Sequence, residues 1–206
     1  MGFFYYPKLP SHYFKNIFKN FENFANNFLN YCKINRNVFK SKKFVDYYKE
    51  AKKAADILGV SARYNLGFAD GFFQNDQEHQ EKLIAYIRHL QPEMVLCNAV
   101  EDRHPDHGRA AQLVAESCFL SGLQKVETTF EGENQTAWRP KQLYHYIQWN
   151  NTAPDVVVNI SDQMELKLRA VMAYDSQFYK PNSTEPETPI STQNFLDSIK
   201  YRAADL

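Results

Sequence analysis

A short apolar run, MVLCNA at residues 94–99, constrains the fold of this 206-residue chain more than any other feature. A strand that is apolar on both faces is typical of a parallel sheet covered by helices. Residues 77–90 precede it with Leu and Ile at helical spacing, and residues 107–121 follow it as a helix of small residues. Strand and helix therefore alternate, which predicts an α/β fold with a mainly parallel sheet.

The same signals predict the other elements of the chain. Residues 49–58 are expected to be the end of a helix that Gly59 stops, and Asp76 is the expected N-cap of the helix over 77–90. Further strands are expected at residues 62–68, 143–148 and 156–160, a turn at 69–71, and further helices at 162–177 and 192–204.

Residues 1–45 differ in composition from the rest of the chain. They hold seven Lys and one Arg against the single acid Glu22, a net charge of +7, and nine of the 16 Phe. Three interpretations are open: a basic aromatic arm for membranes or nucleic acid, a structural extension, or a segment never selected to fold with the rest, such as an out-of-frame translation. The Phe, Asn and Lys excess of A+T-rich codons favours the third. We therefore divide the chain into an anomalous segment, 1–45, and a domain, 46–206.

Composition excludes several classes of protein. The formal net charge is zero and the pI is about 7, which argues against a general nucleic-acid or membrane-surface binder. Three widely spaced cysteines, Cys32, Cys97 and Cys118, do not suggest a disulfide framework, so a cytoplasmic location is expected. No apolar run is long enough to span a bilayer. The sequence leaves room for a homo-oligomer.

A dense polar loop, residues 101–109, follows the apolar strand. It contains two His, three acids and two Arg. Ligands of open parallel sheets collect beyond the carboxyl ends of the strands, and this loop also begins a helix. A solvated loop in which Asp102 or Asp106 caps the helix is the alternative. Pro105 stiffens the spacing of the two histidines, which favours a functional site.

The sequence His104-Pro105-Asp106-His107 suits part of a zinc site. Neutral imidazole is the commonest zinc ligand, and a carboxylate usually orients it. The four residues could supply one ligand, one acid beyond it and one acid or base. A hydrolytic zinc site needs about three protein ligands and an open water position, so this loop cannot complete it.

The remaining histidines and cysteines give weaker signals. His79 and His89 are expected at the surface or boundary of their helix. His145 alternates with Tyr144 and Tyr146, which favours packing over a pocket-facing role. No histidine lies near Cys97 or Cys118 in the sequence to suggest a nucleophile.

Three segments, 60–71, 102–111 and 173–179, resemble the bacillithiol-biosynthesis deacetylases of the LmbE/PIG-L-like superfamily. The resemblance runs from about residue 49 to the end of the sequence. It implies a Rossmann-like three-layer sandwich and a zinc-dependent N-deacetylase. The implied substrate is a small amino-sugar conjugate, N-acetylglucosaminyl malate, with neither nucleic acid nor membrane as a partner.

The resemblance also assigns roles to residues. His107 would be the third metal ligand, His104 would stabilise the oxyanion or protonate the leaving amine, and Asp106 would orient His104. Our own addition is that Arg103 meets a malate carboxylate of the substrate.

The sequence departs from the family at its most informative motif. The family's A-H-P-D-D motif, which carries the other two metal ligands and the general base, does not occur here. We therefore expect the first strand to be missing and the family domain to be incomplete at both ends. Three hypotheses follow: a zinc deacetylase whose site includes His107, an inactive truncated or frameshifted remnant, and a non-enzymatic interaction protein that uses the basic arm.

Overall fold

The computed structural model describes residues 42–181 and 186–204. The predicted anomalous segment, 1–45, therefore lies almost entirely outside the described residues. The first described helix, α2 (Lys42–Leu58), begins four residues before the expected domain boundary at residue 46. The division into a segment and a domain stays a prediction.

A small parallel sheet occupies the centre of the described fold. Strand β1 (Met94–Cys97) pairs in parallel with β4 (Gln142–His145), with Met94 opposite Gln142 and Cys97 opposite His145. Met94 and Leu96 pack with Tyr146 on one face, and Cys97 packs on the other. The apolar run at 94–99 is thus a strand buried on both faces, as predicted.

Helices α3 (Gln77–Leu90) and α4 (Pro105–Leu120) cover one face of this sheet. Ile87 of α3 and Val114 and Cys118 of α4 form a buried cluster with Cys97. Asp76 caps α3, as predicted, because its side chain accepts a hydrogen bond from the backbone N–H of His79 (3.1 Å). These elements fix where β1 ends, and therefore where the loop before α4 lies.

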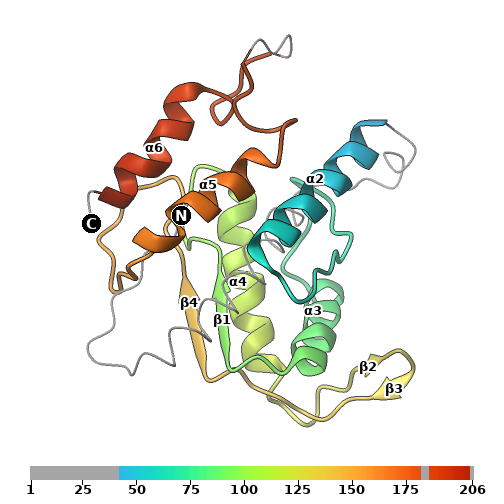
Figure 1. Cartoon of the computed structure of the whole chain (residues 1–206). Coiled ribbons are helices and arrows are strands. Elements are labelled where there is room, and N and C mark those ends of the chain that lie inside the picture. Colours follow the sequence, from blue (N-terminus) through green and yellow to red (C-terminus); the bar gives the residue numbers. More distant parts are fainter. Residues whose placement is uncertain (1–41, 182–185, 205–206) are drawn as a thin grey trace.

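The other described helices lie toward the opposite end of the molecule from a short hairpin (Figure 1). Helix α2 packs on α5 (Met164–Met172) through small residues and Tyr174. Gly59 ends α2 with φ +70°, which glycine adopts without strain. The remaining elements are the hairpin β2 (Thr129–Phe130) and β3 (Glu133–Asn134), the short helix η2 (Ser161–Gln163), and α6 (Gln193–Ala204).

The prediction of an α/β fold with a parallel sheet is confirmed, and two of its predicted strands are wrong. Residues 62–68 form no strand, because Asn65 Oδ1 accepts the backbone N–H of Gly67 (2.8 Å) and Gly67 turns the chain at φ +69°. Residues 156–160 carry a bridge at Val157 alone, although Val158 packs beneath β1. The three-layer sandwich and the missing first strand stay predictions.

Two helix boundaries also differ from the prediction. Helix α4 begins at Pro105 rather than at 107. Helix α5 ends at Met172 rather than at 177, and the chain then turns so that the Tyr174 carbonyl accepts the N–H of Gln177 (3.0 Å). Glu50 of α2 binds this turn through the backbone N–H and hydroxyl of Ser176 (2.9 and 2.7 Å). Within the described residues, no helix is long and apolar enough to cross a membrane.

Arg88 of α3 attaches the segment after α4 to the helix layer. Its buried guanidinium donates to four oxygens, those of Ser121, Leu123, Val126 and Thr128, at 2.6–3.0 Å. Burial lowers the pKa of Arg88.

Replacing Arg88 with Met is expected to cost about 3 kcal/mol of unfolding free energy, since several buried acceptors lose their donor. Urea unfolding measures the loss. Arg88→Lys keeps the charge but not the planar set of donors, and should lose most of the same stability. Full stability in both variants would contradict the anchoring role.

Candidate functional site

The loop between β1 and α4 is fixed by a cap that the sequence did not predict. His104 is the N-cap of α4, and its Nδ1 accepts the backbone N–H of Asp106 (3.2 Å). Pro105 occupies the first turn, where its missing N–H costs nothing. An accepting Nδ1 places the proton of the neutral imidazole on Nε2. His104 therefore presents Nε2–H as a hydrogen-bond donor.

His107 is paired with a buried carboxylate. Its Nδ1 lies 3.0 Å from Oδ1 of Asp102, whose side chain is 1% exposed. Asp102 Oδ2 also accepts the backbone N–H of Trp149 (2.6 Å). Burial favours a higher pKa for Asp102, but the hydrogen bonds from Trp149 and His107 outweigh it and keep the pKa below its usual value.

Burial lowers the pKa of His107, and Asp102 opposes this only in part. His107 is therefore neutral at pH 7, with Nδ1–H directed at Asp102 and Nε2 as the nitrogen that suits a metal. A carboxylate behind a ligating histidine is the usual arrangement in zinc sites. Sequence reasoning considered Asp102 only as a helix cap and missed this pairing.

Asp106 is buried and binds a turn 35 residues away in the sequence. Its Oδ2 accepts the backbone N–H of Gly71 (2.7 Å), and its Oδ1 accepts from Arg109 Nη1. Arg109 also donates to the Gly71 carbonyl (3.3 Å). The contact between Asp106 and His104 runs through the backbone N–H of Asp106, so its carboxylate serves the turn at Gly71.

This turn brings a further acid to the loop. Possible ligand atoms of Asp70, His104 and Asp106 lie within 4.8 Å of one another. Sequence reasoning assigned Asp70 only to a turn, so its place beside His104 was missed. His107 is not part of this group. The described residues therefore offer two candidate sets of metal ligands, one centred on the Asp102–His107 pair and one on Asp70 and His104.

Arg103 and Gly108 complete the loop. The Arg103 guanidinium carbon lies 4.7 Å from the ring centre of Trp149, a cation–π contact. A Cβ on Gly108 would come within 2.9 Å of the Val100 carbonyl oxygen, so this position in α4 requires glycine. This contact does not involve a carboxylate. The role of Arg103 in binding a carboxylate of the substrate therefore stays a prediction.

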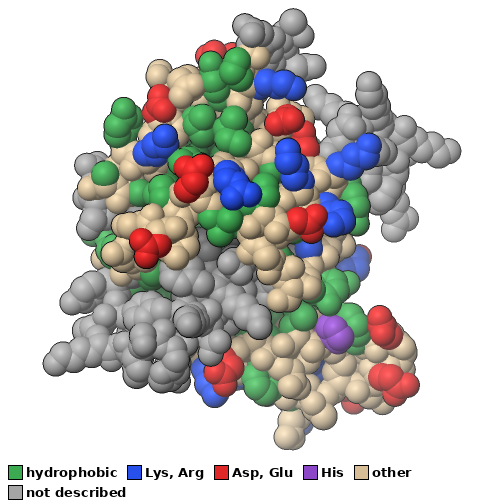
Figure 2. All heavy atoms as spheres, in the orientation of Figure 1, with side chains coloured by type: hydrophobic (Ala, Val, Ile, Leu, Met, Phe, Trp, Pro, Cys, Tyr) green, Lys and Arg blue, Asp and Glu red, His purple; other side chains and the backbone are tan. Residues whose placement is uncertain are grey.

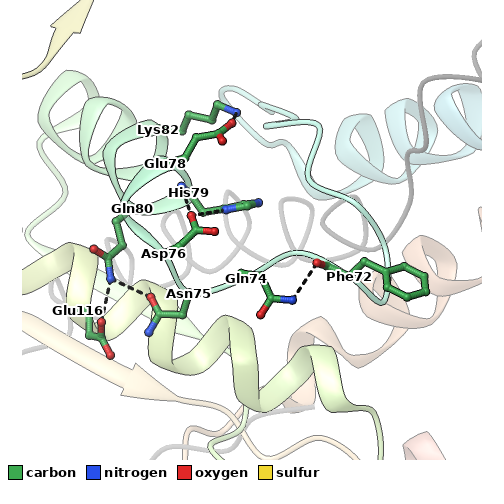
Figure 3. A network of polar contacts seen from close by, with 9 residues as sticks. All are labelled: Phe72, Gln74, Asn75, Asp76, Glu78, His79, Gln80, Lys82 and Glu116. Atoms are coloured by element: carbon green, nitrogen blue, oxygen red, sulfur yellow. Dashed lines mark hydrogen bonds and ion pairs between the residues drawn. The ribbon is translucent and has the colours of Figure 1, made fainter.

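A polar network follows the turn at Gly71 and joins α3 to α4 (Figure 3). Gln80 donates to Asn75 Oδ1 (2.9 Å) and to Glu116 Oε2 of α4 (2.8 Å). His79 Nδ1 lies 2.7 Å from Asp76 Oδ1, and its ring packs on Phe68 at 4.5 Å. His79 thus belongs to the capping network, which fits its expected boundary position.

Cys97 and His145 lie opposite each other in the sheet. Cys97 Sγ is 3.2 Å from His145 Nδ1, which is also 2.7 Å from the Asn98 carbonyl oxygen. Sequence distance hid this pair, because strand register brings the two residues together. Cys97 is fully buried, and burial raises the pKa of its thiol well above the ordinary value. The thiol is therefore protonated at neutral pH and does not suit nucleophilic catalysis.

A surface hollow of about 850 Å³ lies between α2 and α5, away from the loop at 101–109. Basic residues such as Lys49, Lys53 and Arg169 line it together with Asp56 and an apolar floor. Figure 2 shows Lys, Arg, Asp and Glu side chains mixed over the upper part of the face in view. None of the described residues that line the hollow is a histidine, and they offer no acid or base geometry comparable with that of the loop.

Comparison with known proteins finds a matching family model. Residues 39–118 match the family model described as PIG-L: GlcNAc-PI de-N-acetylase. The matched segment, 80 of the 206 residues, is similar to this family. It includes α3, β1, most of α4 and the whole loop at 101–109. Two of the three segments that carry the predicted resemblance, 60–71 and 102–111, lie within the matched residues, which supports the resemblance to this family.

Two curated relatives are deacetylases. The chain is 31% identical to a diacetylchitobiose deacetylase of Thermococcus kodakarensis over 133 residues, 63% of this chain and 49% of that protein. It is 29% identical to a probable N-acetyl-alpha-D-glucosaminyl L-malate deacetylase 2 of Bacillus cereus over 151 residues, 69% of this chain and 63% of that protein. The matched part of the chain thus spans about half of the length of the first relative and less than two thirds of the length of the second.

Solved structures share the fold. A conserved protein of Thermus thermophilus superposes with a TM-score of 0.67 at 28% identity, covering 91% of this chain and 81% of that one. The N,N'-diacetylchitobiose deacetylase of Pyrococcus horikoshii gives a TM-score of 0.58 at 23% identity, covering 77% and 55%. The second likeness concerns the fold alone.

Proposed function

We propose that the loop at 101–109 belongs to a zinc-dependent N-deacetylase centre. Its substrate would be an N-acetylated amino-sugar conjugate, and we choose N-acetylglucosaminyl malate because the Bacillus cereus relative is named for it. The observation that carries the proposal is the Asp102–His107 pair at 3.0 Å, at the edge of the sheet where β1 ends. A neutral histidine oriented by a buried carboxylate is a donor that fits zinc.

The residues of the loop have separate tasks in this proposal. Bound zinc would polarise the amide carbonyl and lower the pKa of a water molecule. His107 would hold the metal through Nε2. His104, with Nε2–H as its donor, would meet the oxyanion or the leaving amine, and Arg103 would meet a carboxylate of the substrate.

The chain supplies only part of the donor set that the family uses. The A-H-P-D-D motif is absent, so two expected ligands and the general base have no counterpart in the sequence. We therefore propose a site that holds zinc below stoichiometry and turns over far more slowly than a complete deacetylase. The remnant hypothesis differs from this one in predicting neither zinc nor acetate.

Zinc content and acetate release from N-acetylglucosaminyl malate, measured on one purified sample, test the proposal. We expect residual zinc and slow acetate release, both at least tenfold lower in His107→Ala. His79→Ala is the matched control, because His79 lies in the capping network of α3, and it should change neither quantity.

Asp70→Asn separates the two candidate ligand sets. If zinc falls in Asp70→Asn and is retained in His107→Ala, the group of Asp70, His104 and Asp106 holds the metal and the role of His107 is refuted. Absence of zinc and acetate from the unmodified chain would leave the remnant hypothesis standing.

A further inference from the structure

Helix α6 contacts the segment 148–151, which follows β4, although none of the described residues of α6 is buried. Arg202 donates from Nη1 to the Gln148 carbonyl oxygen and from Nη2 to Asn151 Oδ1 (2.9 Å). Figure 1 shows α6 near the upper end of β4. A planar guanidinium with donors to two points of one segment fixes the position of that segment relative to α6.

An aromatic contact joins the same helix to the same segment. The rings of Phe195 and Trp149 are 6.2 Å apart between centres, with their planes 12° apart. Phe195 also stacks on Phe178, at 5.9 Å and 13°. On the side of the site, the Trp149 ring carries the guanidinium of Arg103. Trp149 therefore contacts both α6 and the loop at 101–109.

The backbone of Trp149 reaches the buried carboxylate of the site. Its N–H donates to Asp102 Oδ2 (2.6 Å), while Asp102 Oδ1 lies 3.0 Å from His107 Nδ1. With one carboxylate oxygen held by this N–H, the other oxygen is directed at His107. The orientation of the Asp102–His107 pair thus depends on the orientation of the Trp149 N–H.

One peptide unit connects Arg202 with Asp102. The carbonyl that accepts from Arg202 is that of Gln148, and the N–H that donates to Asp102 is that of Trp149, so both groups belong to the same planar amide. Fixing the carbonyl end of a planar amide fixes the direction of its N–H. A cationic donor on the oxygen also polarises the amide and strengthens its N–H as a donor.

The side chain of Gln148 holds this peptide unit against the sheet. Its Oε1 accepts from Asn98 Nδ2 and from the Ala99 N–H, both at 3.1 Å, just beyond the end of β1. The peptide unit is therefore held from the sheet as well as from α6, at the edge where parallel sheets bind their ligands.

We propose that Arg202 is a positioning residue of the candidate site, which acts through the Gln148–Trp149 peptide unit on Asp102. Asp102 in turn orients His107. The inference rests on the proposed function, because it concerns the carboxylate behind the proposed zinc ligand. Its test uses the chain treated with a chelator, so that neither zinc nor acetate release enters the measurement.

Two-dimensional NMR of the full chain observes the Trp149 amide directly. In Arg202→Met we expect the Trp149 amide proton to move upfield and its hydrogen exchange to become about tenfold faster, since its bond to Asp102 weakens. Arg202→Lys keeps a cationic donor for the Gln148 carbonyl and should restore most of the shift. Lys200→Met, at an exposed position of the same helix, is the matched control and should leave the Trp149 amide unchanged.

The Tyr146 amide, which donates to the Cys97 carbonyl (3.0 Å), reports general loosening of the sheet. It should stay unchanged in Arg202→Met. The proposal is overturned if the Trp149 amide keeps its shift and exchange rate in Arg202→Met, or if the Tyr146 amide changes as much as the Trp149 amide. Absence of zinc from the unmodified chain would instead contradict the proposed function, and the Trp149 amide would still decide whether Arg202 positions Asp102.

Discussion

Unfolding free energy should rise by roughly 2 kcal/mol as the pH is raised from 7 to 8.5, because of Lys167. Burial and Arg202 lower the pKa of this amine from 10.5 to about 7 in the folded chain. The unfolded chain keeps the ordinary value. Between these two values the unfolded state binds a proton that the folded state does not, so stability increases with pH across that window.

Unfolding free energy stops rising near pH 8.5 because of the buried cysteines. Burial raises the pKa of the Cys97 thiol, and raises that of Cys118 to about 12, so both stay protonated in the folded chain. Unfolded thiols ionise from about pH 8.5, which makes stability fall with pH above that value. His107, with its pKa below 6.5, acts only on the acidic side. The thiols offset part of the rise as pH 8.5 is approached, so the contribution of Lys167 is obtained by comparison with a variant that lacks this amine.

Lys167→Met should remove this slope and raise the unfolding free energy at pH 7 by about 2–4 kcal/mol, since no unpaired amine remains buried. Urea midpoints at pH 7, 7.75 and 8.5 measure both effects. Lys82→Met, at an exposed position, should keep the slope. A slope that survives in Lys167→Met would assign the pH dependence to another group.

Local sequence signals were sufficient to predict the helices and the strand around the loop at 101–109. The apolar residues of β1, the Asp76 cap of α3 and the glycine that ends α2 act within a few residues, and the structure confirms each of them. The strand predicted at 62–68 was wrong because its apolar residues, including the buried Phe68, pack on Phe73 and on α4 rather than pairing with another strand. Apolar side chains alone do not distinguish these outcomes.

Sequence reasoning predicted the histidines of the candidate site but missed the partners of its carboxylates. His104 and His107 stand out because they are three residues apart after a buried strand. The partners of the loop come from distant segments: Gly71 reaches Asp106 across 35 residues, and Trp149 reaches Asp102 across 47. The group that each carboxylate binds depends on tertiary contacts, and the spacing of residues in the sequence does not reveal these contacts.

Asp106→Ala is expected to lower the unfolding free energy by about 3–5 kcal/mol. Asp106 is 1% exposed, and its removal leaves the Arg109 guanidinium and the Gly71 N–H without their acceptor. Asp106→Asn keeps the volume and one acceptor for Gly71 but loses the charge that Arg109 requires, so its loss should be intermediate. Urea unfolding at pH 7 in the presence of a chelator measures each variant.

A double-mutant cycle with Arg109→Met identifies the cause of this loss. If the ion pair is responsible, removing both partners should cost at least about 1.5 kcal/mol less than the sum of the single variants. If Asp106 were instead a metal ligand, the chelator would lower the stability of the unmodified chain and reduce its difference from Asp106→Asn. Equal differences with and without chelator would mean that Asp106 acts by holding the turn at Gly71.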